Sequence, residues 1–247
     1  MRLIVEGLSK DFQKNGTRIL ALEEISFEIN DGEFVSIVGP SGCGKSTLLK
    51  CIAGLIPHDK GIVRYENIKD KKRPLSAIVF QELCLFPWRN VFKNISFGLE
   101  ELGVPKPLRK EKVNSFIELM KLKGFERFYP TELSGGMRQR VAIARAMVLE
   151  PELLLMDEPM GSLDAITAQE LQLEHMELIT KRRQSVLYVT HSIPEAVFLS
   201  DRVIVMSSRP GKIKGIVDIE VPRPRKKAFK TSQEFVHYLD VLWGMLG

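Results

Sequence analysis

The chain has 247 residues, of which 44% are apolar and 27% are charged, which suits one large α/β domain with a sizeable core and room for a subdomain. Its formal charge of +5 is a mild positive excess, which would favour binding of phosphate ligands, an anionic membrane surface or nucleic acid. A solvated surface slightly richer in lysine is the simpler explanation. No apolar run approaches the ~18 residues that span a bilayer, and residues 1–6 meet a charge too early for a signal peptide, so a role at a membrane would need another chain as anchor.

The first 86 residues contain short apolar runs of strand length. We expect strands over Leu3–Gly7, Ile19–Ile29, Glu33–Val38, Ile62–Tyr65 and Ala77–Phe80. The run Glu33–Val38 ends in Gly-Pro, as suits a buried strand that feeds a tight turn, and a helix should follow from Ser46.

Helical spacing replaces this pattern between residues 87 and 150. We expect helices over Arg109–Lys121 and Met137–Val148, the second because apolar residues recur three or four apart. Strands followed by helices then return at Leu153–Met156, Ser185–Thr190 and Arg202–Met206, and this alternation is typical of a mostly parallel sheet covered on both faces. The pattern predicts an α/β core of residues 1–86 and 151–230, a helical insertion over 87–150, and an amphipathic C-terminal helix within 231–247 that docks on the core.

A glycine-rich segment lies between the strand Glu33–Val38 and the helix from Ser46. It fits GxxxxGK[ST] at every fixed position, and with the next residue it comprises Gly39, Pro40, Ser41, Gly42, Cys43, Gly44, Lys45, Ser46 and Thr47. Glycines let backbone N–H groups turn toward phosphate oxygens, and the following helix directs its positive end at the same anion. Lys45 supplies a charge for the outer phosphates and Ser46 a hydroxyl ligand for Mg²⁺. The segment predicts a nucleoside triphosphate site, and a structural turn with an accidental lysine is the weaker alternative.

Two acids follow the apolar run Leu153–Met156. Asp157 and Glu158 stand at the carboxyl end of this predicted strand, the end that faces the nucleotide crevice in an open α/β sheet. Asp157 is placed to hold Mg²⁺, directly or through water. Glu158 is placed to orient and polarise the attacking water, either as general base or by positioning it. An ordinary polar strand end is the alternative, and the phosphate loop in the same chain disfavours it.

The segment Leu133–Arg140, LSGGMRQR, indicates a second anion site. Ser134, Gly135 and Gly136 open a predicted helix, so a capping hydroxyl, exposed amides and a helix N-terminus point outward together. A plain N-cap is the simpler interpretation of these residues alone. One chain with two phosphate sites and one nucleotide crevice, however, suggests that the second site serves another copy of the chain.

With these segments in view, the chain resembles the ATP-binding cassette family over nearly its whole length. LSGGMRQR is similar to the signature motif of that family. The other matches are Gly39–Thr47 (Walker A), Gln81 (Q-loop), Leu153–Glu158 (Walker B), Ser162–Asp164 (D-loop), His191 (switch histidine) and Phe12 (the aromatic that stacks on adenine). Two departures are minor: the family often has Tyr at the place of Phe12, and Phe at the place of Met160.

The resemblance implies a P-loop NTPase (RecA-like) core with a mostly parallel sheet, an N-terminal antiparallel β subdomain and an inserted helical subdomain. It implies hydrolysis of ATP with Mg²⁺ in a homodimer that sandwiches two ATP molecules. Ser134, Gly135 and Gly136 of one copy then touch the γ-phosphate held by the other, and Asp164 contacts the facing copy. His191 contacts the γ-phosphate, and Gln81 reaches Mg²⁺ and the water.

The same resemblance implies membrane partners. The chain would lie peripherally on the cytoplasmic face of the membrane, bind transmembrane permease subunits directly, serve an extracytoplasmic solute-binding protein indirectly, and bind no nucleic acid. The loop after Gln81 would report the nucleotide state to the permease. Phe86, Pro87 and Trp88 either offer apolar anchors to it or pack on their own domain.

Three stretches resemble the importer branch for nitrate, taurine and aliphatic sulfonates, whose members also serve thiamine-precursor pyrimidines and riboflavin. They are Phe80–Glu82 with Phe86–Arg89, Glu195–Asp201, and Ser208–Lys212 with Val221–Arg225. A separate ATPase subunit that ends soon after its core favours an importer. The alternatives are an ATPase of a lipid-trafficking or lipoprotein-export complex and a soluble cassette ATPase; the second fits poorly, because no sustained heptads separate Gln81 from Ser134.

The cysteine spacing, one basic cluster and three of the histidines indicate no additional functional site. The cysteines Cys43, Cys51 and Cys84 lack disulfide-framework or zinc spacing and indicate a reducing compartment. The basic cluster over residues 223–230, flanked by prolines, is expected to be a solvated turn rather than a nucleic-acid patch. His58, His175 and His237 match no motif.

Overall fold

The computed structural model describes residues 1–14, 16–160 and 165–247, without the side chains of 14, 165–171 and 175. The predicted D-loop residue Asp164 and the side chain of His175 therefore lie outside the described part of the chain. The chain divides into two compact units, one formed by Met1–Lys69 with Gln172–Gly247 and the other by Asp70–Leu171.

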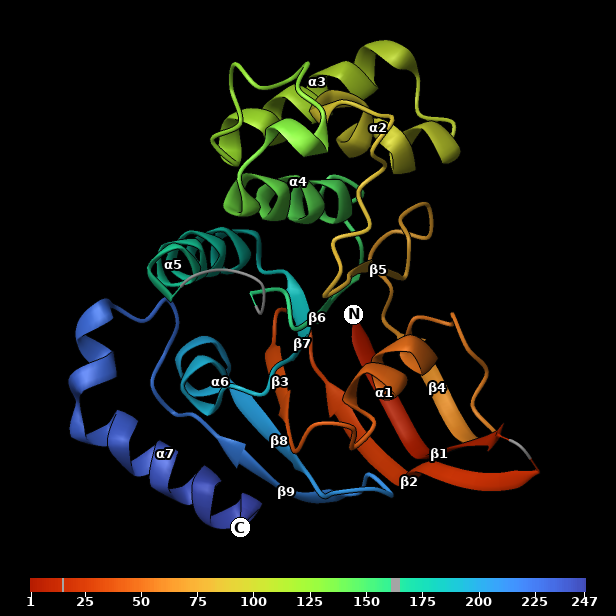
Figure 1. Cartoon of the computed structure of the whole chain (residues 1–247), viewed down its shortest axis with the longest axis vertical. Coiled ribbons are helices and arrows are strands. Elements are labelled where there is room, and N and C mark those ends of the chain that lie inside the picture. The colour runs from red at the N-terminus through yellow and green to blue at the C-terminus, as the bar shows by residue number, and fades with distance from the viewer. Residues whose placement is uncertain (15, 161–164) are drawn as a thin grey trace. The chain divides into compact units, whose positions relative to one another are not determined.

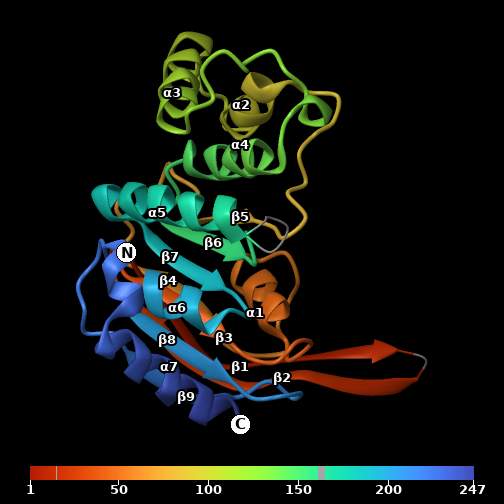
Figure 2. The ribbon, with the colours of Figure 1, turned by 60° about the vertical axis from the view of Figure 1, so that its left-hand side comes forward.

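An antiparallel sheet opens the first unit. Its strands are β1 (Arg2–Lys14), β2 (Thr17–Ile29) and β4 (Lys60–Glu66), in the order β2-β1-β4. The strands β1 and β2 run side by side as a long hairpin (Figure 2). β1 is longer than the apolar pattern predicts, because its pairing with β2 continues through polar residues until Lys14 lies opposite Thr17. The antiparallel subdomain implied by the family resemblance is confirmed.

Parallel strands form the centre of the same unit. β3 (Phe34–Val38) lies between β7 (Ser185–Val189) and β8 (Arg202–Met206), and both neighbours are parallel to it. Every residue of β3 and β7 is buried, which is why both appear in the sequence as largely apolar runs, with Ser36 and Ser185 as their polar members. β9 (Ile213–Asp218) pairs antiparallel with β8 and was not predicted, because its half-buried and exposed residues alternate without a strong apolar run.

The first unit is completed by helices, a short 3-10 turn, and the part of α5 (Ala165–Arg182) from Gln172 onward. α1 (Lys45–Ile52) follows β3, α6 (Ile193–Leu199) follows β7, and the 3-10 turn η2 (Lys227–Thr231) precedes α7 (Gln233–Leu246). α7 buries Phe235 and Leu242 and contacts α6, β8 and β9, at the C-terminal end of the chain in Figure 1. The predicted docking of the C-terminal helix on the core is confirmed.

The second unit combines two parallel strands with a helical group. β5 (Ser76–Val79) pairs with β6 (Leu153–Asp157). α2 (Val91–Glu101) packs against α3 (Lys106–Leu119) and α4 (Gly135–Met147), and η1 (Pro130–Glu132) precedes α4 (Figure 1). α5 (Ala165–Arg182) follows β6 along the chain. α2 was expected only as part of a helical stretch; the side chain of Asn90 begins it by accepting from Lys93 N.

The observed architecture confirms the predicted α/β class, with mostly parallel strands, a separate antiparallel sheet and a helical segment. Within the described ranges, every helix is too short or too polar to cross a bilayer.

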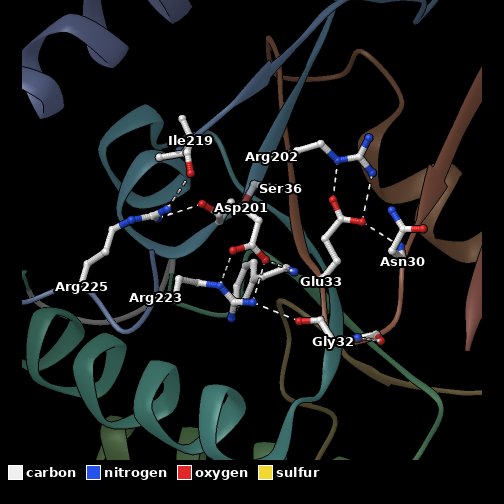
Figure 3. Close-up of polar contacts among 12 residues, drawn as sticks. Asn30, Gly32, Glu33, Ser36, Asp201, Arg202, Ile219, Arg223 and Arg225 are labelled. Atoms are coloured by element: carbon white, nitrogen blue, oxygen red, sulfur yellow. Dashed lines mark hydrogen bonds and ion pairs between the residues drawn. The ribbon is translucent and has the colours of Figure 1, made fainter. Parts of the chain in front are cut away.

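The prediction of a solvated basic turn at residues 223–230 is wrong for Arg223 and Arg225, although Lys226 and Lys227 are exposed as expected. Arg225 is only 3% exposed, and its guanidinium donates to the carbonyl oxygens of Val197 and Ser200 at the end of α6. Arg223 forms an ion pair with Asp201 at 2.7 Å (Figure 3). Buried carbonyl groups at a helix end need donors, and this segment supplies them. Burial lowers the pKa of Arg225 to about 10, which leaves it charged at neutral pH.

Candidate active site

The glycine-rich segment forms a turn between β3 and α1. Gly44 caps α1 with φ 108°, and a Cβ built there would lie 2.8 Å from Cδ2 of Leu22 and 3.0 Å from the carbonyl oxygen of Ala21. Only glycine fits that backbone conformation in that space. No side chain caps α1, so the positive end of its dipole faces the turn, and that favours an anion.

Lys45 brings a charge to this turn. Its side chain is buried, and Nζ donates to the carbonyl oxygens of Gly39 at 2.8 Å and Pro40 at 3.1 Å. The loop carbonyls thereby hold the ammonium beside the N-terminus of α1. An ammonium and a helix N-terminus at one turn both favour a bound phosphate.

A turn between β8 and β9 braces the phosphate loop. Arg209 Nη2 donates to the carbonyl oxygen of Gly42 at 3.1 Å, and Gly211 N donates to Ala21 O at 2.9 Å. A Cβ on Gly211 would lie 2.3 Å from the carbonyl oxygen of Cys43. In the sequence, Ser208–Lys212 stands out only as a mark of a family branch. This contact was not predicted, since nothing in the local sequence shows where the turn packs.

His191 lies at the same sheet edge as the phosphate loop. In the parallel pairing of β3 with β7, Ile37 is opposite Val189, and Thr190 N donates to Ile37 O at 3.2 Å. Gly39 and His191 each come two residues after this pair, so both lie just beyond the carboxyl ends of the two strands, at the same edge of the sheet. His191 is exposed there. The structure thus brings these two predicted parts together within the first unit.

Phe12, the predicted adenine-stacking residue, lies on β1 opposite Ile19. The residue is 41% exposed, with Nζ of Lys10 5.4 Å from the ring centroid. An aromatic face of this exposure can receive a flat base.

The predicted carboxylate pair and Gln81 come together in the second unit. Asp157 ends β6 and is 5% exposed, while Glu158 follows it with φ 42°, a left-handed conformation that is uncommon outside glycine and clusters at functional sites. In the pairing of β5 with β6, Val79 is opposite Met156. Gln81 and Glu158, each two residues further along, therefore lie at the same carboxyl-end edge of this strand pair. Mg²⁺ is usually bound through one or two carboxylates together with phosphate oxygens and water, so the buried Asp157 at this strand end suits the ion.

The signature segment forms the predicted helix start. Ser134 is exposed, caps α4, and accepts a hydrogen bond from Met137 N at 3.3 Å. Gly135 and Gly136 form the first turn, where the absence of side chains leaves the backbone amides approachable. The expected N-cap is confirmed, and its chemistry suits an anion.

A phosphate loop after a buried strand and a buried acid at the end of another parallel strand define a nucleotide-binding protein of the P-loop class. Residues 22–161 match the family model described as ABC transporter. Because that match covers more than half of the chain, the chain belongs to the ABC transporter family, and it is an ATP hydrolase, the ATPase subunit of a transporter.

Similarity in sequence and structure to other ABC transporter proteins supports this family assignment. An uncharacterized ABC transporter ATP-binding protein of Methanocaldococcus jannaschii is 49% identical over 96% of this chain and 88% of its own length. The aliphatic sulfonates import ATP-binding protein SsuB of Bacillus cereus is 43% identical over 95% of this chain and 92% of its own length. Among solved structures, the dimeric structure of the bacterial ABC transporter cassette MJ0796 has a TM-score of 0.78 with 29% identity, covering 89% of this chain and 100% of that chain. A post-hydrolysis state of the same cassette, bound to ADP and Pi, has a TM-score of 0.77.

Proposed function

We propose that this chain energises a membrane importer for a small oxyanionic or related solute, in the group of nitrate, taurine and aliphatic sulfonates. The observation that carries the proposal is the 43% identity to an aliphatic sulfonates import ATP-binding protein over nearly the full length of both chains. The stretches Phe86–Arg89 and Ser208–Lys212 support the same branch. In this proposal the chain acts peripherally at the cytoplasmic face of the membrane.

On the nucleotide side, we propose that the phosphate loop and Lys45 bind the β- and γ-phosphates. Ser46 and Asp157 would hold Mg²⁺, which neutralises the charge that develops on the phosphates when it is bound. The proposed role of Glu158 is to orient the attacking water and accept its proton, with Gln81 as a second contact to the water and the ion. His191 would donate a hydrogen bond to the γ-phosphate as charge builds on it. Phe12 would stack on adenine.

We propose a homodimer in which the signature helix of one copy completes the site of the other. Ser134, Gly135 and Gly136 would supply donors to the γ-phosphate, and Asp164 would contact the facing copy. The support is the exposed cap of α4 in this chain together with the dimeric state of the similar cassette MJ0796. Donors that arrive only on dimer closure would couple hydrolysis to association.

The loop after Gln81 is the proposed contact for the permease. Asn94 holds it from α2, accepting from Phe86 N and donating to Arg89 O at 2.7 Å. Phe86 packs against Phe97 with ring centroids 4.7 Å apart, so it serves its own unit. Trp88 is 72% exposed and is the apolar anchor that this loop offers to a partner. The extracytoplasmic solute-binding protein would act through the permease.

A pair of variants tests the shared site. Glu158→Gln should bind ATP but not hydrolyse it, and light scattering should show a dimer that appears only with ATP. Adding Ser134→Arg to that variant should return the protein to monomers while each monomer still binds ATP, because the bulky cation obstructs only the facing copy. A Glu158→Gln variant that hydrolyses ATP at the normal rate would remove the catalytic assignment. ATP-dependent dimers of the double variant would remove the shared site.

A second experiment tests the solute class. ATPase activity is measured in vesicles that hold the permease, with the solute-binding protein added together with nitrate, taurine, alkanesulfonates or pyrimidine precursors. Stimulation by a sulfonate or nitrate supports the proposal. Stimulation only by pyrimidines, or by none of these solutes in vesicles whose basal ATPase is intact, contradicts it.

A further inference from the structure

The residues on either side of His191 are tied to Glu195 on the first turn of α6. Ser192 N donates to Oγ1 of Thr190 at 3.0 Å, and that hydroxyl donates in turn to Oε2 of Glu195 at 2.6 Å. The hydroxyl of Ser192 accepts from Glu195 N at 3.4 Å and so caps the helix. His191 therefore lies inside a short hydrogen-bonded segment that Glu195 closes.

Glu195 is itself held from a neighbouring helix. Nε2 of Gln172, on α5, donates to Oε1 of Glu195 at 2.5 Å. Nζ of Lys230 donates to Oε1 of Gln172 at 3.4 Å, which fixes which end of that amide faces the carboxylate. Each carboxylate oxygen of Glu195 thus has a donor from a different element, α5 on one side and the end of β7 on the other.

The far end of α6 is fixed by the C-terminal segment. Arg225 Nη1 donates to the carbonyl oxygens of Val197 at 2.9 Å and Ser200 at 2.8 Å. Arg223 forms an ion pair with Asp201, whose carboxylate also accepts from the backbone N–H of Phe34 (Figure 3). Phe34 begins β3, the strand that leads into the phosphate loop. Residues on both sides of α6 are therefore bonded to β3: Asp201 to Phe34 after its end, and Thr190 to Ile37 before its start.

We propose that Glu195 is a positioning residue for ATP hydrolysis, acting by holding His191 at the edge where the phosphate loop begins. The inference rests on the proposed contact of His191 with the γ-phosphate. A histidine side chain has two rotatable bonds, so the placement of its backbone decides what the imidazole can reach. A misplacement of about 1 Å costs up to about 100-fold in rate. A carboxylate suits this task because it accepts from Thr190 and Gln172 at once.

An acid in the first turn also stabilises a helix, so the test separates positioning from stability. Glu195→Ala in the full-length chain should lower kcat by about 10- to 100-fold and leave the affinity for ATP within about twofold. Thr190→Val, which removes only the hydroxyl, should have the same effect. Glu195→Gln keeps an acceptor for Thr190 but sets its own NH2 group against that of Gln172, so its kcat should lie between those of the wild type and Glu195→Ala. Asp240→Ala, at an exposed carboxylate of α7, is the matched control and should change nothing.

The decisive measurement is a double-mutant cycle with His191→Ala. If Glu195 acts through His191, Glu195→Ala should cause no further loss of kcat in the His191→Ala background. Equal losses of kcat in both backgrounds, or a wild-type kcat for Glu195→Ala and Thr190→Val, would overturn the inference while leaving the role of His191 intact. A wild-type kcat for His191→Ala itself would instead remove the proposed role of His191, and the inference with it.

Discussion

Replacing Arg225 by methionine tests the buried C-terminal arginine. Its guanidinium bonds three carbonyl groups at and beyond the end of α6, those of Val197, Phe198 and Ser200, at 2.8–3.0 Å. It also bonds the carbonyl oxygen of Val221 at 2.9 Å through Nε. Methionine keeps much of the apolar stem but has no donor, so these acceptors would stay buried and unsatisfied wherever water cannot enter.

The expected cost follows from that count. A buried acceptor without a partner costs about 1–3 kcal/mol. The carbonyl groups counted are the three of Val197, Phe198 and Ser200, because the half-buried Val221 can turn to water. Water that reaches some of the three keeps their total toward the low end, at about 3–5 kcal/mol. For a chain of this size each kcal/mol lowers the melting temperature by about 2–4 °C, which gives a fall of about 10 °C. Arg225→Lys should lie between, since one ammonium keeps the charge but cannot span carbonyls from both segments.

Differential scanning calorimetry of the purified chain measures the shift. Lys226→Met is the matched control, because it removes the neighbouring charge from an exposed position. The reasoning is refuted if Arg225→Met melts within about 2 °C of the wild type, or if Lys226→Met lowers the melting temperature as much.

Two further predictions concern the phosphate loop and its flank. Gly211→Ala places a Cβ 2.3 Å from the carbonyl oxygen of Cys43, so the phosphate loop must shift. The Kd for ATP, measured with a fluorescent nucleotide, should then rise at least about tenfold. Gly244→Ala, where a Cβ meets nothing within 4 Å, is the control, and an unchanged Kd for Gly211→Ala would contradict the proposed support of the loop by the β8–β9 turn. The backbone N–H of Asp11 and the ammonium of Lys10 hold the pKa of Asp59 below its ordinary value. A folded pKa below the unfolded one contributes stability at neutral pH that is lost as the pH falls through the folded pKa. Asp59→Asn should therefore lower the melting temperature at pH 7, and the difference should shrink below about pH 4; a difference that stays constant from pH 7 to pH 3 would exclude this account.

Some features of this chain are fixed by residues adjacent in the sequence, and others only by residues far apart in it. The turn Gly39–Gly44, the cap at Ser134 and the acids after Leu153–Met156 could be predicted because contiguous residues fix their geometry. The buried runs of β3 and β7 could also be predicted, since strands covered on both faces are mainly apolar. The division of the chain at residues 87 and 150 and the roles of the individual site residues stay predictions.

Strand pairing and packing decided the rest. That His191 follows the same edge as Gly39, and Gln81 the same edge as Glu158, depends on which strands are neighbours and in what register. Arg225 looked like part of a solvated basic turn, yet it is buried because the carbonyl groups that need it belong to a helix more than twenty residues away in the chain. A sequence states which side chains can donate, but only the tertiary structure places the acceptors that decide whether a charge is buried or left in water.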